Sequence, residues 1–107
     1  MIKGSSFFLY PFKVICLPAP EQEGHAVLFS IPKKKIRGAV ERNLLKRRCR
    51  EAYRLQVGEV LTGNIPQRIA FIYTERKVQP YALIEKRMRR CLEQIQERAA
   101  AQQASKA

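Results

Sequence analysis

The segment 38–57 constrains the fold more than any other part of this chain, because its apolar and cationic side chains repeat with the spacing of an α-helix. At about 100° per residue, one arc of that helix is apolar and the opposite arc is polar and basic. The apolar arc contains Val40, Leu44, Leu45, Cys49, Ala52 and Leu55. The polar arc contains Arg42, Asn43, Lys46, Arg47, Arg50 and Arg54. Such a helix joins a hydrophobic core with one face and presents its cations together on the other.

Two residues of the helix do not fit this division. Arg48 and Glu51 lie on or beside the apolar arc, and we expect them to pair with each other or with neighbours at its edge. Gly58 is expected to end the helix, because glycine commonly follows the last helical residue.

Three segments rich in β-branched and aromatic residues predict strands at 12–17, 26–31 and 68–74. A loop with proline and glycine separates the first two, so we expect them to pair as an antiparallel hairpin. The third is an almost continuous apolar run, which is typical of a strand covered on one or both faces. Residues 1–11 show no clear pattern.

A second helix is predicted from Pro80 onward, because proline is favoured at the first position of a helix. Apolar residues at spacings of three and four indicate its inner face. They are Tyr81, Ile84, Met88, Cys91, Leu92 and Ile95. The alanine- and glutamine-rich residues 99–107 are expected to fray.

The order strand–strand–helix–strand–helix predicts an α+β fold, an α-β sandwich with a small central sheet, a basic crossover helix and a C-terminal helix. A chain of 107 residues has no room for a second core, so we expect residues 1–107 to form a single domain. If the strands on either side of the basic helix are parallel neighbours, the default hand of the crossover is right.

The net charge indicates the kind of partner. The chain has 21 Lys and Arg residues against 9 Asp and Glu, a formal net charge of +12. Such a charge destabilises the fold by self-repulsion and implies a polyanionic partner: nucleic acid, an anionic membrane surface or an acidic protein. No apolar run approaches the roughly 18 residues of a spanning helix, and the N-terminal run lacks the pattern of a signal peptide.

Residues 33–54 contain ten Lys or Arg residues against two Glu. A merely solvated helix face usually alternates charges of opposite sign. Binding to a membrane or a calmodulin-like partner would use the apolar face, which this fold needs for its core. Lys33, Lys34, Lys35 and Arg37 precede the helix, where free N–H groups and the helix dipole favour a phosphate. The segment therefore predicts a one-sided RNA-binding surface.

No catalytic residue and no metal site are predicted within the protein. Cys16, Cys49 and Cys91 lack the spacing of metal ligands and are expected to be buried, reduced thiols. His25 stands alone in a loop and is expected to be exposed and without a role. The carboxylates are too dispersed along the chain for a catalytic pair.

Three motifs stand within residues 31–54: a Lys-Lys pair, the pattern Ala-Val-x-Arg-Asn-x-x-Lys-Arg at 39–47, and Arg-Glu-Ala-Tyr-Arg at 50–54. Together they resemble the signature of the bacterial ribonuclease P protein component. So many fixed positions at fixed spacing leave little room for a chance match. The matching positions are Lys34, Lys35, Ala39, Val40, Arg42, Asn43, Lys46, Arg47, Arg50, Glu51, Tyr53 and Arg54.

The resemblance implies a left-handed crossover around the basic helix, against the default hand. It implies that the partner is the catalytic RNA of ribonuclease P and that the substrate is precursor tRNA. The holoenzyme would be an endonuclease that hydrolyses a phosphodiester to remove the 5′ leader. The RNA would carry the chemistry, with magnesium bound mainly through the RNA, while the protein aids leader binding and magnesium-dependent activity. A cytoplasmic ribonucleoprotein with no membrane contact and no obligate protein partner is expected.

The resemblance and the helical wheel together assign residue roles. The predicted RNA-binding residues are Lys33, Lys34, Lys35, Arg37, Arg42, Asn43, Lys46, Arg47, Arg50 and Arg54. Ala39 and Val40 are expected to set the helix against the sheet. A cleft between sheet and helix is expected to hold the leader. Its predicted lining is Phe7, Phe8, Phe12 and Tyr53, for which a place in the core is the alternative.

Members of this family usually begin with a helix that carries cleft aromatics, and it would lie before Met1. Either the start is truncated or misassigned, or this member binds the leader with fewer contacts. The alternative function is a general RNA-binding structural protein, such as a small ribosomal protein, which would bind many structured RNAs without affecting tRNA processing.

Overall fold

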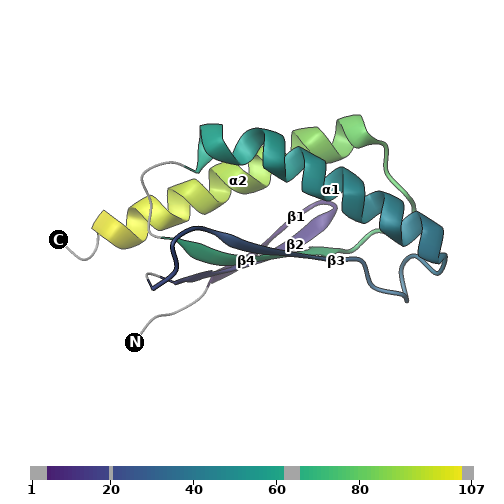
Figure 1. Cartoon of the computed structure of the whole chain (residues 1–107), viewed down its shortest axis with the longest axis horizontal. Helices are drawn as coiled ribbons and strands as arrows, with labels where there is room; N and C mark the ends of the chain where they lie inside the picture. The colour runs from purple at the N-terminus through teal and green to yellow at the C-terminus, as the bar shows by residue number, and fades with distance from the viewer. Residues whose placement is uncertain (1–4, 20, 62–65, 105–107) are drawn as a thin grey trace.

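The computed structural model describes residues 5–19, 21–61 and 66–104, which form a four-stranded sheet with two helices packed on one of its faces (Figure 1). In chain order the elements are β1 (Ser5–Leu9), β2 (Phe12–Pro18), β3 (Ala26–Ser30), α1 (Ala39–Val60), β4 (Gln67–Tyr73) and α2 (Tyr81–Ala104). The predicted α+β class, with a small sheet, a basic crossover helix and a C-terminal helix, is confirmed.

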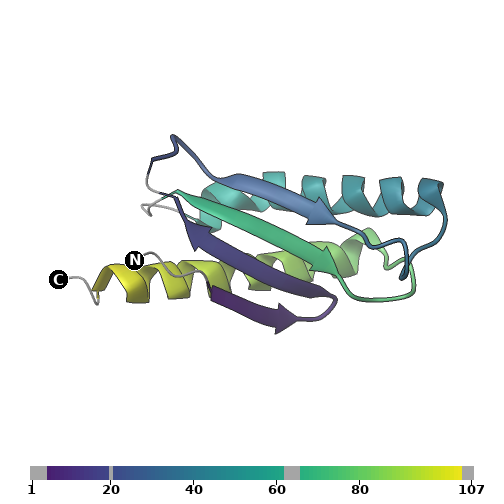
Figure 2. The same cartoon turned by 90° about the horizontal axis from the view of Figure 1, so that it is seen from below.

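The strand order in the sheet is β1-β2-β4-β3 (Figure 2). β2 pairs antiparallel with β1 and β4, whereas β3 pairs parallel with β4. The predicted hairpin between 12–17 and 26–31 is wrong, because β4 lies between these strands. β4 has more buried side chains than any other strand and gains most from a central position, and the loop after β2 is long enough to carry β3 to the far edge. α1 connects the parallel neighbours β3 and β4, and the hand of that crossover stays a prediction.

β1 is a strand that the sequence pattern did not predict. It pairs with β2 along its whole length. Tyr10 and Pro11, joined by a cis peptide bond, form the turn between the two strands. Thr74 ties this turn to the end of β4, because its backbone N–H and its Oγ1 both donate to the carbonyl of Pro11, at 2.8 and 3.0 Å.

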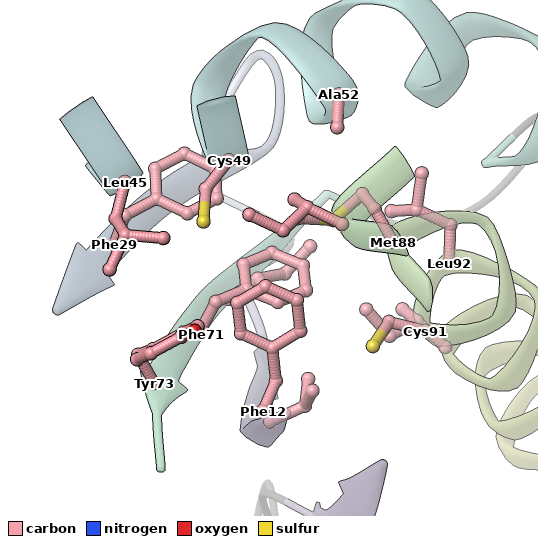
Figure 3. Close-up of a cluster of buried hydrophobic side chains, with 14 of the residues drawn as sticks. Phe12, Phe29, Leu45, Cys49, Ala52, Phe71, Tyr73, Met88, Cys91 and Leu92 are labelled. Carbon is pink, nitrogen blue, oxygen red and sulfur yellow. The ribbon is translucent and has the colours of Figure 1, made fainter. Parts of the chain in front are cut away.

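The hydrophobic core lies between the sheet and the two helices (Figure 3). Strand alternation supplies the sheet's buried residues, which are Phe12, Val14, Cys16, Phe29, Ile69, Phe71 and Tyr73. α1 adds Leu45, Cys49 and Ala52. α2 adds Ile84, Met88, Cys91, Leu92 and Ile95, which confirms the predicted stripe. The three cysteines are free and buried, as predicted.

Phe71 is the aromatic centre of this core. Its ring centroid lies 5.3 Å from that of Phe29 on β3, 5.8 Å from that of Phe12 on β2 and 6.1 Å from that of Tyr53 on α1. Aromatic pairs at such distances attract each other beyond the effect of area burial. The cluster therefore fixes the middle of α1 against the sheet.

The inner face of α1 differs from the predicted apolar arc. Val40 is 77% exposed, Leu55 is 51% exposed, and Ala39 is exposed as well. The start of α1 extends beyond the ends of β3 and β4 (Figure 2), so its first turn has no sheet to pack on. The prediction that Ala39 and Val40 set the helix against the sheet is therefore wrong.

The polar residue Gln56 occupies a core position that the sequence pattern gave to its neighbour Leu55. Gln56 is buried, and its Nε2 donates to the carbonyls of Ala52, at 3.1 Å, and Glu85, at 2.9 Å. Glu85 belongs to α2, so one buried amide joins the two helices. Both donors of the amide are satisfied, which makes burial of the group tolerable.

The predicted helix ends need small corrections. α1 continues through Gly58 to Val60, so the predicted stop is three residues early. α2 begins one residue after Pro80, whose carbonyl accepts from the backbone N–H groups of Leu83 and Ile84, each at 3.2 Å.

The fraying expected of residues 99–107 stays a prediction. α2 continues to Ala104, and Ala99 is buried. Residues 105–107 lie outside the described part of the chain, as do residues 62–65 of the predicted connector after α1.

His25 is not the exposed bystander that the sequence predicts. It is half-buried, and its Nδ1 accepts a hydrogen bond from the backbone N–H of Gln67 at 3.0 Å. Burial lowers the pKa of His25, which favours the neutral ring that this hydrogen bond requires. The imidazole thus fastens the loop before β3 to the first residue of β4.

A reciprocal pair of substitutions tests the inner face of α1. Gln56→Leu removes both hydrogen bonds of the buried amide and should lower the free energy of unfolding by about 1–2 kcal/mol. Leu55→Gln, one position away, should change it by less than about 0.5 kcal/mol, because Leu55 is half-exposed. Urea unfolding followed by circular dichroism measures both. The opposite order of effects would contradict this placement of the two residues.

Candidate nucleic-acid interface

The outer face of α1 carries most of the predicted RNA-binding residues. Leu45, Cys49 and Ala52 point into the core, so the polar arc of the helix points away from the sheet. The exposed members of that arc are Asn43, Arg47, Arg50 and Arg54, whereas Arg42 and Lys46 are half-buried. The predicted separation of an apolar and a cationic face is therefore present, with Arg42 as its main departure.

The cations of this face differ in whether they have partners within the protein. Arg47 and Arg50 make no hydrogen bond or ion pair with any residue in the described ranges 5–19, 21–61 and 66–104. Arg54 pairs with Glu51 at 2.5 Å, but both side chains are exposed, and an exposed ion pair of this kind contributes little. At least two arginines on α1 are thus free to bind phosphates.

The loop between β3 and α1 presents further cations. The carbonyl of Pro32 accepts from the backbone N–H groups of Lys35 and Ile36, at 3.0 and 3.1 Å, and forms a turn. The side chain of Ile36 is buried and anchors the turn to the core. Lys35 is half-buried.

The exposed cations of this loop line a hollow. Lys33, Lys34 and Arg37 surround a volume of about 510 Å³ beside the start of α1. Three cations around one concave space form a suitable place for an anion such as a phosphate group.

Arg42 is turned toward this loop. Its Nη1 donates to the carbonyls of Ile36, at 3.0 Å, and Arg37, at 2.7 Å. The sequence pattern places Arg42 among the direct RNA contacts, whereas the structure gives its guanidinium partners within the protein.

The two residues that did not fit the wheel pair with neighbours and not with each other. Arg48 reaches from α1 to the segment before α2, where its Nη1 donates to the carbonyl of Gln79 at 2.6 Å. Glu51 pairs with Arg54, one turn along the same helix. Arg48 thus has a structural contact and is not part of the outer cationic face.

α2 is also rich in arginine, but two of its exposed arginines have acidic partners. Arg89 lies 3.5 Å from Glu59 and 3.8 Å from Glu93, and Arg90 lies 3.2 Å from Glu93. The exposed positive charge of the described residues is therefore least compensated on α1 and the loop before it.

The predicted leader-cleft residues do not share one site. Phe12 is fully buried in the core, so its predicted place in a cleft is wrong. Tyr53 is half-buried between Phe29 and Phe71, and burial raises the pKa of its hydroxyl. Phe7 is half-buried on the helix-covered side, with the guanidinium carbon of Arg98 4.8 Å from its ring centre.

Phe8 alone of the four lies on the opposite face of the sheet, where it is 64% exposed. No described helix covers that face (Figure 2). Ile15, Leu17 and Leu28 are exposed there as well and help to line a hollow of about 390 Å³. Sequence reasoning missed this surface, although β2 has apolar residues on both of its faces, which is the pattern of a strand covered twice.

The acidic, histidine and cysteine side chains of the described residues do not gather into a metal-binding cluster. Within the described residues, no three His, Cys, Asp or Glu side chains lie close enough together to hold a metal ion. Burial raises the pKa of Cys49 and of Cys91 to about 12, so both thiols stay protonated and unreactive. None of the helices in the described ranges is long and apolar enough to cross a membrane.

Comparisons with known proteins agree with this geometry. The model of the Ribonuclease P family matches residues 1–96. The ribonuclease P protein component of Porphyromonas gingivalis is 33% identical over 99 residues, which span 87% of this chain and 72% of that protein.

Solved structures share the fold. The RNase P protein of Staphylococcus aureus superimposes with a TM-score of 0.72 at 22% identity, over 86% of this chain and 81% of that one. A mutant of the S. aureus protein with defective mRNA degradation activity gives a TM-score of 0.72 at 23% identity, over 87% of this chain and 75% of that one. With the family model matching nearly the whole sequence and a curated relative one-third identical, this chain belongs to the ribonuclease P protein family.

Proposed function

We propose that this chain, as the protein subunit of the tRNA 5′-processing enzyme ribonuclease P, binds the catalytic RNA through the outer face of α1 and the loop before it. The observation that carries the proposal is a group of exposed cations without acidic partners among the described residues. Its members are Lys33, Lys34, Arg37, Arg47 and Arg50. A cytoplasmic location and the absence of an obligate protein partner are part of the same proposal.

The shape of α1 suits a long polyanion. Its 22 residues extend about 33 Å, a length that follows several consecutive phosphates. Arginine predominates among its free cations, and the planar guanidinium binds phosphate oxygens in pairs. α2, of similar length, is a weaker candidate because its exposed arginines lie close to Glu59 and Glu93.

The uncovered face of the sheet is the second part of the proposal. We infer that the single-stranded 5′ leader of precursor tRNA lies on this face, against Phe8 and the neighbouring apolar residues. Single strands are commonly bound by bases stacking on aromatic rings, with cations along the backbone. Lys13 is exposed on this face, and Arg68, which contacts Gln22 and Glu21, lines its hollow.

The proposal also assigns different roles to the protein and the RNA. The described residues offer no cluster of metal ligands, so magnesium is expected to bind mainly through the RNA, where it supplies the hydrolytic chemistry. The contribution of this chain is to neutralise phosphates of the catalytic RNA and to hold the leader. Both effects should reduce the magnesium concentration that the RNA needs.

The decisive experiment adds the purified protein to the catalytic RNA at low magnesium and measures 5′ cleavage of precursor tRNA. Cleavage should be faster than with the RNA alone. A general RNA-binding structural protein would bind the RNA without accelerating cleavage, and that result would refute the assignment of this role.

Loss of two free arginines should weaken the electrostatic part of RNA binding. Arg47→Gln with Arg50→Gln should flatten the dependence of log affinity on log salt by about 1.4–1.8, because each phosphate contact contributes about 0.7–0.9 to that slope. The matched control is Arg89→Gln with Arg90→Gln, which removes the same charge from α2. Equal flattening by the two pairs would show that net charge, and not the α1 face, governs binding.

Replacement of Phe8 should affect leader recognition selectively. In the holoenzyme, Phe8→Ala should lower the preference for precursor over mature tRNA by at least about fivefold, because stacking on one base contributes about 1–3 kcal/mol. Phe8→Tyr keeps the ring and should retain the preference. Binding titrations with both RNAs measure it, and an unchanged preference in Phe8→Ala would remove this residue from the leader site.

A further inference from the structure

The contacts of Arg42 are unusual for a cation in an RNA-binding helix. Arg42 is half-buried in the first turn of α1, and one nitrogen, Nη1, donates to two backbone carbonyls, those of Ile36 and Arg37. A terminal guanidinium nitrogen has only two hydrogens, so Nη1 is fully used within the protein. Asn43, the next residue along the helix, is exposed.

The two carbonyls belong to the end of the loop that holds the exposed cations. Upstream, the loop is restrained by the turn at Pro32 and by the buried side chain of Ile36. Between Ile36 and the start of α1, the hydrogen bonds of the Arg42 guanidinium restrain the backbone. Lys34, which precedes Ile36, and Arg37, which follows it, line the same hollow.

Helix electrostatics argue that this arrangement does not serve helix stability. The first turn of a helix is its positive end, where a cation is unfavourable. The carbonyls of Ile36 and Arg37 offset that cost, because they present partial negative charge to the guanidinium. The observed conformation of the loop therefore supplies the partners that make an arginine favourable at this position.

We propose that Arg42 is a positioning residue, which acts on RNA binding by holding the loop so that Lys33, Lys34 and Arg37 face one phosphate site together. This inference rests on the proposed function of α1 and its loop as the RNA interface. It separates Arg42 from Arg47 and Arg50, whose guanidinium groups have no partner among the described residues and are free to contact phosphates directly.

A charge-preserving substitution distinguishes the two roles. Arg42→Lys keeps the positive charge, but its side chain is one bond shorter, so its ammonium ends short of the position from which Nη1 of Arg42 reaches both carbonyls. Affinity for the catalytic RNA should fall about tenfold, because the loop must then be ordered during binding. Arg47→Lys, the matched control, loses only one paired guanidinium contact, so its affinity should fall clearly less than that of Arg42→Lys.

A double-mutant cycle measures whether Arg42 and the loop cations act together on RNA affinity, which a merely structural role of Arg42 would not produce. In a background where Lys33, Lys34 and Arg37 are all replaced by Gln, Arg42→Lys should cause no further loss of affinity. Arg47→Gln should cause the same loss of affinity in both backgrounds, because the effects of distant, independent sites add.

Hydrogen exchange tests the loop in the free protein, where its backbone amides should exchange faster in Arg42→Lys than in Arg47→Lys. Melting curves establish that each variant is folded, and Arg42→Gln supplies a second variant for the same cycle.

Each outcome decides between the interpretations. If Arg42→Lys retains full affinity, or if Arg42→Gln costs the same with and without the loop cations, Arg42 is a phosphate contact and the inference fails while the RNA interface stands. If the loop variants and the Arg47 variants all bind like the unmodified protein, the proposed RNA interface itself fails, and the inference fails with it.

Discussion

The packing of aromatic rings around Phe71 determines where the functional surfaces of this protein lie. Phe71 is on the central strand β4, and its neighbours Phe12, Phe29 and Tyr53 come from three other elements. Tyr53 is the contribution of α1, so this cluster sets the rotation of α1 about its own axis. That rotation directs Arg47 and Arg50 outward. The cationic face is thus positioned from within the core, although none of its members is buried there.

The distribution of charge between the helices has a physical cost and a purpose. A net charge of +12 on a small domain lowers its stability by repulsion. Glu59 of α1 and Glu93 of α2 limit that cost, because they lie beside Arg89 and Arg90 of α2. α1 carries free cations that lack such partners among the described residues. Bound RNA removes this repulsion, so the protein should be more stable in the complex than alone.

Sequence periodicity predicted the helices, three of the strands and the outward cationic face, because each depends on local spacing along the chain. It missed β1, whose residues 5–9 are too few to show a clear alternation. Periodicity could not predict the strand order, because the pairing of β2 with β4 joins segments about fifty residues apart. A helical wheel also assumes one flat partner surface. Gln56 faces α2 and Val40 lies beyond the sheet, so neither has the burial that the wheel predicts. Arg42 also differs from the prediction, because its partners are main-chain carbonyls.

The sheet is a single layer that separates two different tasks. Along β2, Phe12, Val14 and Cys16 are buried under the helices, while Lys13, Ile15 and Leu17 alternate with them on the uncovered face. Neighbouring residues of one short strand therefore belong alternately to the core and to the outer surface. Point changes on the outer face, where we propose that the leader binds, should therefore cost little in folding. Insertion or deletion of one residue would exchange the two sets at once. During divergence of the family, β2 should accordingly accept new side chains readily while keeping its length.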